Sequence, residues 1–203
     1  VNLSTSKFKN NYVRALCYQL FENNGVIKRE IIHQTIKNIS KEDRTNLRKA
    51  GIKIGRYHIF LPKMLKPGAV DLRVKLWKLY FPEDKKYKIP KSGLNFLKNE
   101  KEKNNKFLLI CGFENFKDFY VRVDILERLF VKIIENTKDG MFRIDSDMIN
   151  LVGCSKENFF KLLKLMQYVP KNNKNKTEEF FVYRPKLQKT SIKKEKKTSK
   201  NNP

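Results

Sequence analysis

The sequence predicts a mainly helical α+β fold with small β elements, organised as two modules followed by a basic tail. Three observations predict it. Apolar residues recur at helical spacing along most of the chain, one glycine-containing segment instead alternates apolar and polar residues, and the end of the chain is lysine-rich with almost nothing to bury. A length of 203 residues is sufficient for one large core or two small ones.

Residues 1–11 are polar and are expected to be frayed, and residues 12–82 are predicted to form a helical accessory domain. Local signals mark its helices: Asn23-Asn24-Gly25 ends the first, Ser40 with Asp43 begins the third, and Pro67 opens the fourth. The fourth helix contains Trp77 and is expected to be largely buried. The expected helical ranges are 11–24, 28–37, 40–51 and 66–81.

A change of period sets residues 52–61 apart. Apolar and polar residues alternate around Gly55, which predicts a β-hairpin-like strand pair bent at that glycine. Tyr57 and Phe60 are expected to be core residues. Arg56 has two interpretations: it contacts nucleic acid, or it forms an ion pair with Asp71 or with a neighbouring domain that this chain lacks.

Residues 83–106 are charged and weakly periodic, which predicts a connector with one docked piece near Leu94–Leu97 and a domain boundary near 90–105. Residues 107–185 then follow the order of a winged-helix-like module, beginning with a short buried strand at Phe107–Cys111. An ordinary small α+β packing module that happens to share this order is the alternative. Residues 186–203 are predicted to be a disordered Lys-rich tail.

Within the distal module, each element has its own signal. A long apolar stripe predicts a helix from Asp124 to Thr137, and Met141–Ile144 fits a strand. Ser146 is expected to cap a second helix that ends at Gly153, and Ser155 to cap a third. The wing tip is expected at residues 171–177, with its return strand at 180–183.

The chain carries 45 Lys and Arg against 21 Asp and Glu, a formal charge of +24, which favours a polyanionic partner. The alternative is that compositional drift places many of these cations on solvated faces. Cys17, Cys111 and Cys154 lie far apart and favour a reducing compartment, hence the cytoplasm. There is no apolar run of 18 residues and no signal-peptide pattern, so we expect no membrane partner. Because the chain starts at Val1 rather than Met, we expect a fragment of a longer protein.

The residues needed for catalysis are not found in this sequence. None of the eight glycines heads a phosphate loop, and no Asp-Glu pair follows an apolar strand. The two histidines, His33 and His58, lie in unrelated contexts, and no Cys/His ligand cluster occurs. We therefore expect this chain to contain no ATPase, metal or cofactor site of its own, and His33 to be structural.

Several separated stretches, in order, resemble the region beyond the helicase core in bacterial relatives of the mitochondrial-degradosome type of ATP-dependent RNA helicase, a superfamily-two DExH-box helicase. They are Ala15–Val26, Leu47–Trp77, Val121–Leu129 and Ile149–Ser155. The resemblance implies that the full-length protein binds ATP and magnesium in a core that this chain lacks. It also implies that this chain is an accessory region whose partners are RNA, the upstream helicase domains and a ribonuclease.

Basic residues near aromatic ones predict contacts with single-stranded RNA. In the distal helix that begins after Ser155, the lysines lie away from the apolar stripe, where a recognition helix would meet phosphates. The alternatives are a free-standing winged-helix protein that binds duplex DNA, and a protein-docking scaffold of an RNA-degradation complex. The candidate nucleic-acid contacts are Lys53, Arg56, His58, Lys63, Lys66, Lys156, Lys161, Lys164, Lys171, Lys174 and Lys176.

Overall fold

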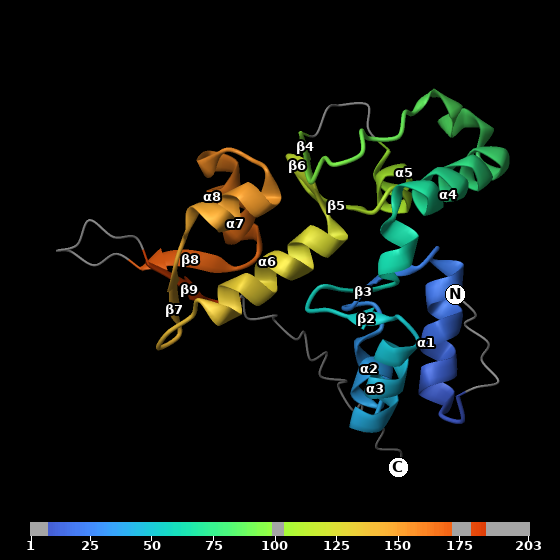
Figure 1. The fold of residues 1–203 in the computed structure, drawn as a ribbon, viewed down its shortest axis with the longest axis horizontal. Coiled ribbons are helices and arrows are strands. Elements are labelled where there is room, and N and C mark those ends of the chain that lie inside the picture. Colours follow the sequence, from blue (N-terminus) through green and yellow to red (C-terminus); the bar gives the residue numbers. More distant parts are fainter. Residues whose placement is uncertain (1–7, 99–103, 172–179, 186–203) are drawn as a thin grey trace, which may run out of the picture.

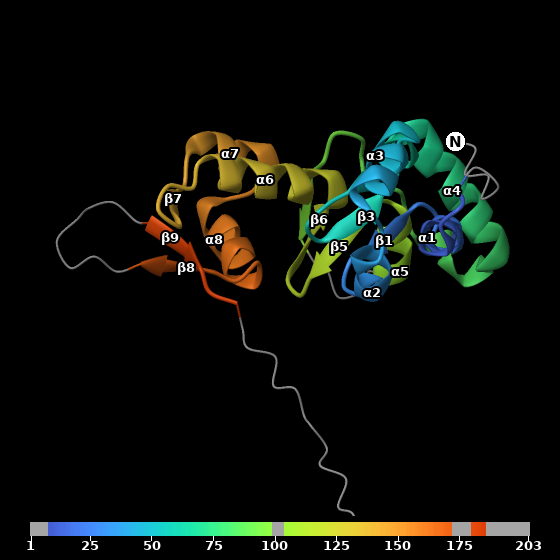
Figure 2. The ribbon, with the colours of Figure 1, turned by 90° about the horizontal axis from the view of Figure 1, so that it is seen from below.

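The computed structural model describes residues 8–98, 104–171 and 180–185, and it confirms a mixed α+β fold. Figure 1 shows two groups of elements joined by the long helix α6 (Val123–Glu135). Viewed from below, in Figure 2, the winged-helix elements lie on one side of α6 and the N-terminal helices on the other. No helix in the described ranges is long and apolar enough to cross a membrane.

The N-terminal group packs three helices around a three-stranded antiparallel sheet of order β1-β3-β2. Its core is closed by apolar residues such as Leu16, Leu47 and Ile59, which are fully buried. Two predicted helix boundaries are confirmed: Gly25 follows the first helix at positive φ, and the Ser40 side chain accepts a hydrogen bond from the Asp43 amide. The elements are α1 (Asn11–Glu22), β1 (Val26–Lys28), α2 (His33–Lys37), α3 (Lys41–Lys49), β2 (Lys53–Ile54) and β3 (His58–Phe60).

The strand β1 corrects the prediction of a helix over 28–37. Val26 pairs with Phe60 and Lys28 with His58, so the predicted strand pair is the larger part of a three-stranded sheet. Only His33–Lys37 is helical. The reason is tertiary: β1 gains ladder hydrogen bonds and buries Val26 and Ile27 by pairing with a strand about 30 residues away, and local spacing does not report such a partner.

Helix α4 (Pro67–Tyr80) follows the short 3-10 turn η2 (Pro62–Leu65) and begins with proline, as predicted. Its burial is a correction. Val70, Arg73 and Val74 are buried, but the opposite side of the helix is exposed. That side carries Leu72, Leu76, Leu79 and Tyr80. The sequence suggested an enclosed helix because α4 is apolar on both sides, and the structure covers only one of them.

A second sheet, of order β4-β6-β5, lies between α4 and α6. The docked piece predicted in the connector is β4, which pairs with β6. The segment expected to be a strand at Phe107–Cys111 is instead the helix α5, whose N-cap Asn104 accepts from the amides of Lys106 and Phe107. A short apolar run fits a buried helix as well as a strand. The elements here are η3 (Pro82–Lys86), β4 (Phe96–Lys98), α5 (Asn105–Ile110), β5 (Phe113–Phe116) and β6 (Phe119–Arg122).

Helix α5 packs against α4 in one apolar cluster, which includes Val70, Val74 and Phe107. The predicted boundary near 90–105 therefore does not coincide with a break in packing.

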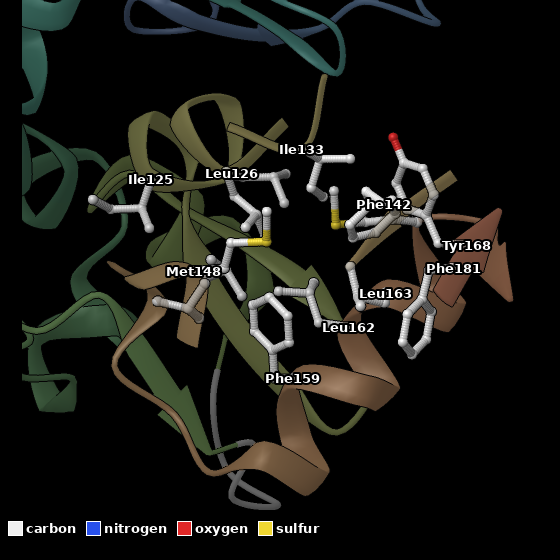
Figure 3. Packing of buried hydrophobic residues seen from close by; sticks show 14 of the residues in the cluster. Ile125, Leu126, Ile133, Phe142, Met148, Phe159, Leu162, Leu163, Tyr168 and Phe181 are labelled. Carbon is white, nitrogen blue, oxygen red and sulfur yellow. The ribbon is translucent and has the colours of Figure 1, made fainter. Parts of the chain in front are cut away.

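The distal elements have the predicted winged-helix order. They are α6, β7 (Met141–Arg143), α7 (Ser146–Val152), α8 (Lys156–Leu165), β8 (Tyr168–Lys171) and β9 (Phe180–Tyr183). The strands form an antiparallel sheet of order β7-β9-β8. Figure 3 shows Phe159, Leu162 and Leu163 of α8 pointing toward Leu126 and Ile133 of α6. The predicted wing tip and the Lys-rich tail lie largely or wholly outside the described residues.

The cap of α7 is one residue earlier than predicted. The Asp145 side chain accepts from the Met148 amide, whereas Ser146 is the first helical residue. Both residues are N-cap types, and the spacing alone did not separate them. Ser155 caps α8 by accepting from the Asn158 amide, and Gly153 ends α7 in the left-handed conformation, both as predicted.

Candidate nucleic-acid interface

A buried glutamate of α6 holds the turn between β2 and β3. The carboxylate of Glu127 accepts hydrogen bonds from the backbone amides of Arg56 (2.6 Å), Tyr57 (2.8 Å) and His58 (2.7 Å). Glu127 is only 2% exposed, so these bonds are protected from water. Figure 1 shows this turn reaching toward α6, and the three bonds fix it there.

Gly55 makes this close approach possible. A Cβ built on Gly55 would lie 2.3 Å from Cδ of Glu127, far inside van der Waals contact. The glycine predicted as a bend therefore has a second role, which is to leave room for a carboxylate. The backbone carbonyl of Gly55 also accepts a hydrogen bond of 2.8 Å from Nη1 of Arg29.

The contact between the Glu127 carboxylate and the backbone amides of residues 56–58 forms a joint between the two groups of elements, and a chain of charged groups continues from it. Nε2 of His58 lies 2.8 Å from Oε2 of Glu114, and the other oxygen of Glu114 lies 2.6 Å from Nζ of Lys28. Nδ1 of His58 lies 3.6 Å from Oε1 of Glu127, close enough for electrostatic attraction but without a hydrogen bond. The imidazole thus lies between two carboxylates.

Burial by itself would lower the pKa of His58, but the hydrogen bond to Glu114 and the interaction with Glu127 outweigh burial, and the net effect raises the pKa. For Glu127, burial opposes ionisation, while His58 and the three backbone amides favour it more strongly and lower the pKa. The pKa of Glu114 is lowered in the same way, against burial, by His58 and Lys28. These shifts favour the charged forms of His58, Glu114 and Glu127, so the groups of the joint attract one another electrostatically.

A pocket of about 340 Å³ opens beside this joint. It receives side chains from both groups of elements: the N-terminal sheet contributes cations, and the winged-helix module contributes the end of α8 and part of β9. Among its lining residues are Lys28, Arg29, Arg56, Tyr57, Phe116 and Tyr183. Nη2 of Arg56 donates a hydrogen bond of 3.1 Å to the Tyr183 hydroxyl, which connects the two groups at the rim.

Apart from His58, the predicted contact residues fall into three sets. Lys53, Arg56, Lys63 and Lys66 are exposed on the N-terminal group, although only Arg56 reaches the pocket. Exposed on the winged-helix module are Lys156, Lys161, Lys164 and Lys171. Lys174 and Lys176 lie outside the described residues.

His58 is a correction. It was predicted as a nucleic-acid contact, but it is only 2% exposed and its ring is engaged by Glu114. Alternation suggested a surface position, but β3 is the central strand of its sheet and all three of its residues are buried. Phe60 is buried as predicted. The suggested ion pair between Arg56 and Asp71 is also absent: Asp71 pairs with Lys75.

Sequence reasoning missed Arg29, Glu114 and Glu127. Arg29 was placed within a helix, and the two glutamates lie in or beside apolar stretches that were interpreted as packing elements. One signal was present: Glu127 interrupts the apolar stripe of α6, and an acid inside a buried stripe indicates a specific partner.

The ionisable groups of the joint are occupied with one another and with backbone amides. No cluster of three or more His, Cys, Asp or Glu residues that could hold a metal ion occurs in the part of the chain that the structure describes.

Comparison with family models, with curated proteins and with solved structures found no match. The resemblance to RNA helicases therefore stays a prediction, and the function must be proposed from the geometry of this interface.

Proposed function

We propose that this chain is the accessory C-terminal nucleic-acid-binding region of an ATP-dependent RNA helicase, where it contacts single-stranded RNA that passes through the motor domains. The observation that carries the proposal is the joint at Glu127, which fixes the basic turn of the N-terminal sheet beside the winged-helix module. Side chains of both parts consequently face one pocket. An unpaired nucleotide can enter such a pocket, whereas a base pair inside a duplex cannot.

Charge and sequence order support the same proposal. The formal charge of +24 favours a polyanion, and the helicase-like stretches occur in the family's order. ATP and magnesium would belong to the upstream core, and a ribonuclease and the upstream domains would be the protein partners, in the cytoplasm. Reading the gene upstream of Val1 tests this membership, since we expect a phosphate loop and a DExH box there.

The winged-helix topology favours a second candidate, a DNA-binding protein. Helix α8 buries Phe159, Leu162 and Leu163 and exposes its lysines, as a recognition helix does in the major groove. The exposed apolar side of α4 favours a third candidate, a protein-docking scaffold, because large exposed apolar patches mark interaction sites.

The proposal is tested by titrating the protein with fluorescent decauridylate RNA and, separately, with duplex DNA over a range of salt concentrations. We expect tighter binding to the single strand. The logarithm of the affinity should decrease linearly with the logarithm of the salt concentration, with a slope of about −0.7 for each phosphate that the protein neutralises. Absence of RNA binding at low salt would reject the nucleic-acid role.

Two charge-reversed variants separate the candidates. Lys53→Glu with Arg56→Glu should weaken RNA binding at the joint. Lys161→Glu with Lys164→Glu should instead abolish duplex binding if α8 is a recognition helix. Duplex preference, loss of duplex binding in the α8 variant and a dimer in gel filtration would together favour the DNA-binding candidate.

A further inference from the structure

Two guanidinium groups at the pocket lack a carboxylate partner. Arg29 and Arg56 both line the pocket, and neither forms an ion pair with any residue that the structure describes. Arg29 donates to the Gly55 carbonyl and Arg56 to the Tyr183 hydroxyl, so both side chains are oriented by neutral groups. Burial, and then the positive charge of Arg56 nearby, lower the pKa of Arg29. Like charges held close together in this way favour binding of an anion.

The acids near the pocket form no ion pair with Arg29 or Arg56, although the charge of Glu127 acts to raise the pKa of Arg29. Glu114 is engaged by Lys28 and His58, and Glu127 by three backbone amides. Glu30 is the remaining acid on the pocket lining, and it is exposed, so solvent screens its charge. Arg29 and Arg56 therefore remain available to donate paired hydrogen bonds to an anion, such as two oxygens of a phosphate.

Aromatic rings lie beside the two arginines. The ring of Tyr183 is 5.9 Å from the guanidinium carbon of Arg56, and Tyr183 is 42% exposed. Tyr57 and Phe116 are half-buried in the same lining. Tyr57 packs edge-to-face on Phe130, which fixes its ring. Tyr183 itself packs against Tyr168, with ring centroids 5.5 Å apart, and an exposed ring held in this way is suited to stacking with a base.

We propose that this pocket binds one unpaired nucleotide of RNA, with its phosphate between Arg29 and Arg56 and its base against Tyr183. The volume of about 340 Å³ lies at the lower end of the range of about 300–1,000 Å³ usual for ligand pockets, which suits a single nucleotide. The inference rests on the proposed RNA-binding function and specifies where and how a strand is gripped. The phosphate is either an internal phosphodiester or a terminal phosphomonoester.

The test is fluorescence-anisotropy binding of decauridylate to the full chain and its variants, with and without a 5′-phosphate. Arg56→Gln and Arg29→Gln should each weaken binding about tenfold to a hundredfold. Lys85→Gln, which removes one exposed charge from η3, should weaken it far less. An affinity raised by the 5′-phosphate identifies a terminal phosphomonoester, and an unchanged affinity identifies an internal phosphodiester; both agree with the proposal.

Tyr183 variants test stacking separately from hydrogen bonding. Tyr183→Phe keeps the ring but removes the hydroxyl that orients Arg56, so it should lose less affinity than Tyr183→Leu, which lacks the ring and should lose about tenfold. Circular dichroism checks folding. If Arg29→Gln does not fold, Arg56→Gln alone tests the proposal, because Arg56 is exposed. Affinities of Arg56→Gln and Tyr183→Leu equal to that of Lys85→Gln would overturn the nucleotide site while leaving RNA binding intact. No binding by the unmodified chain would instead overturn the proposed function.

Discussion

A histidine between two glutamates makes stability depend on pH in a defined direction. Because the pKa of His58 is raised on folding, its contribution is complete below its unfolded pKa of about 6.5 and is lost as the pH rises through its folded pKa. The pKa values of Glu114 and Glu127 are lowered, so their contribution is complete above about pH 4.3 and is lost as the pH falls through their folded pKa values. The joint should stabilise the fold most between about pH 4.3 and 6.5.

The variant His58→Gln isolates the alkaline side of this profile. In the unmodified protein, the urea concentration at the unfolding midpoint should decrease as the pH is raised from about 5.5 to about 8.5. This decrease should be much smaller in His58→Gln, because the titrating group is gone. His33→Gln is the matched control, since His33 is exposed. Equal falls in His58→Gln and in the unmodified protein would show that the imidazole does not titrate as described.

Gly55 is required by space rather than by backbone conformation. In Gly55→Ala the new methyl group would meet the Glu127 carboxylate, and overpacking of this kind costs about 1–3 kcal/mol. Gly68→Ala is the control: its Cβ would have no neighbour within 4 Å, and it lies at the start of α4, where alanine adds up to about 1 kcal/mol of stability. Thermal unfolding of the two variants should shift in opposite directions, and a neutral Gly55→Ala would contradict the close approach.

At the scale of single elements, the start of α7 gives a direct test of the corrected cap. Asp145→Ala should lower the free energy of unfolding by about 1 kcal/mol, because the Met148 amide loses its acceptor. Ser146→Ala should stay within about 0.5 kcal/mol, since Ser146 is exposed and already helical. Urea unfolding measures both. A larger loss of unfolding free energy in Ser146→Ala than in Asp145→Ala would show that Ser146 is the N-cap residue.

Elements with local signals could be predicted from the sequence, and those that depend on distant partners could not. Ser40, Pro67, Gly153 and Ser155 act on neighbouring residues, so their helix boundaries were found. Strand β1 needs β3 as its partner, and neither periodicity nor turn residues report that pairing. Helix α5 was missed for a related reason, since its short apolar run is compatible with both states until the packing on α4 is known.

The site follows the same rule. Arg56 was predicted because it is a cation beside a glycine bend and an aromatic residue, all close in sequence. The groups that orient it are remote: the Glu127 carboxylate meets the Arg56 amide across 71 positions, and His58 meets Glu114 across 56. Contacts of this separation form only when both parts of the chain have folded, so composition and spacing indicated the charge of the interface but not its geometry.

For the whole molecule, the consequence is that Glu127 connects its two groups of elements, as the Arg56–Tyr183 hydrogen bond also does at the pocket rim. Glu127 lies on α6, whose apolar side belongs to the winged-helix core, yet its carboxylate binds the N-terminal sheet. In Glu127→Gln the shape is kept, but one acceptor oxygen becomes a donor that faces backbone N–H groups. Breaking a buried charged interaction of this kind costs about 3–5 kcal/mol.

Hydrogen exchange can show that this loss occurs at the joint. In Glu127→Gln the amides of Arg56, Tyr57 and His58 should exchange much faster, because three protected donors lose a charged acceptor. Amides within α3 should be affected only through global stability. Glu135→Gln, an exposed change on the same helix, should leave both sets unchanged. If turn and α3 amides of Glu127→Gln accelerate equally, the variant has lowered global stability alone; a selective acceleration at the turn means that Glu127 holds the pocket's basic rim in place.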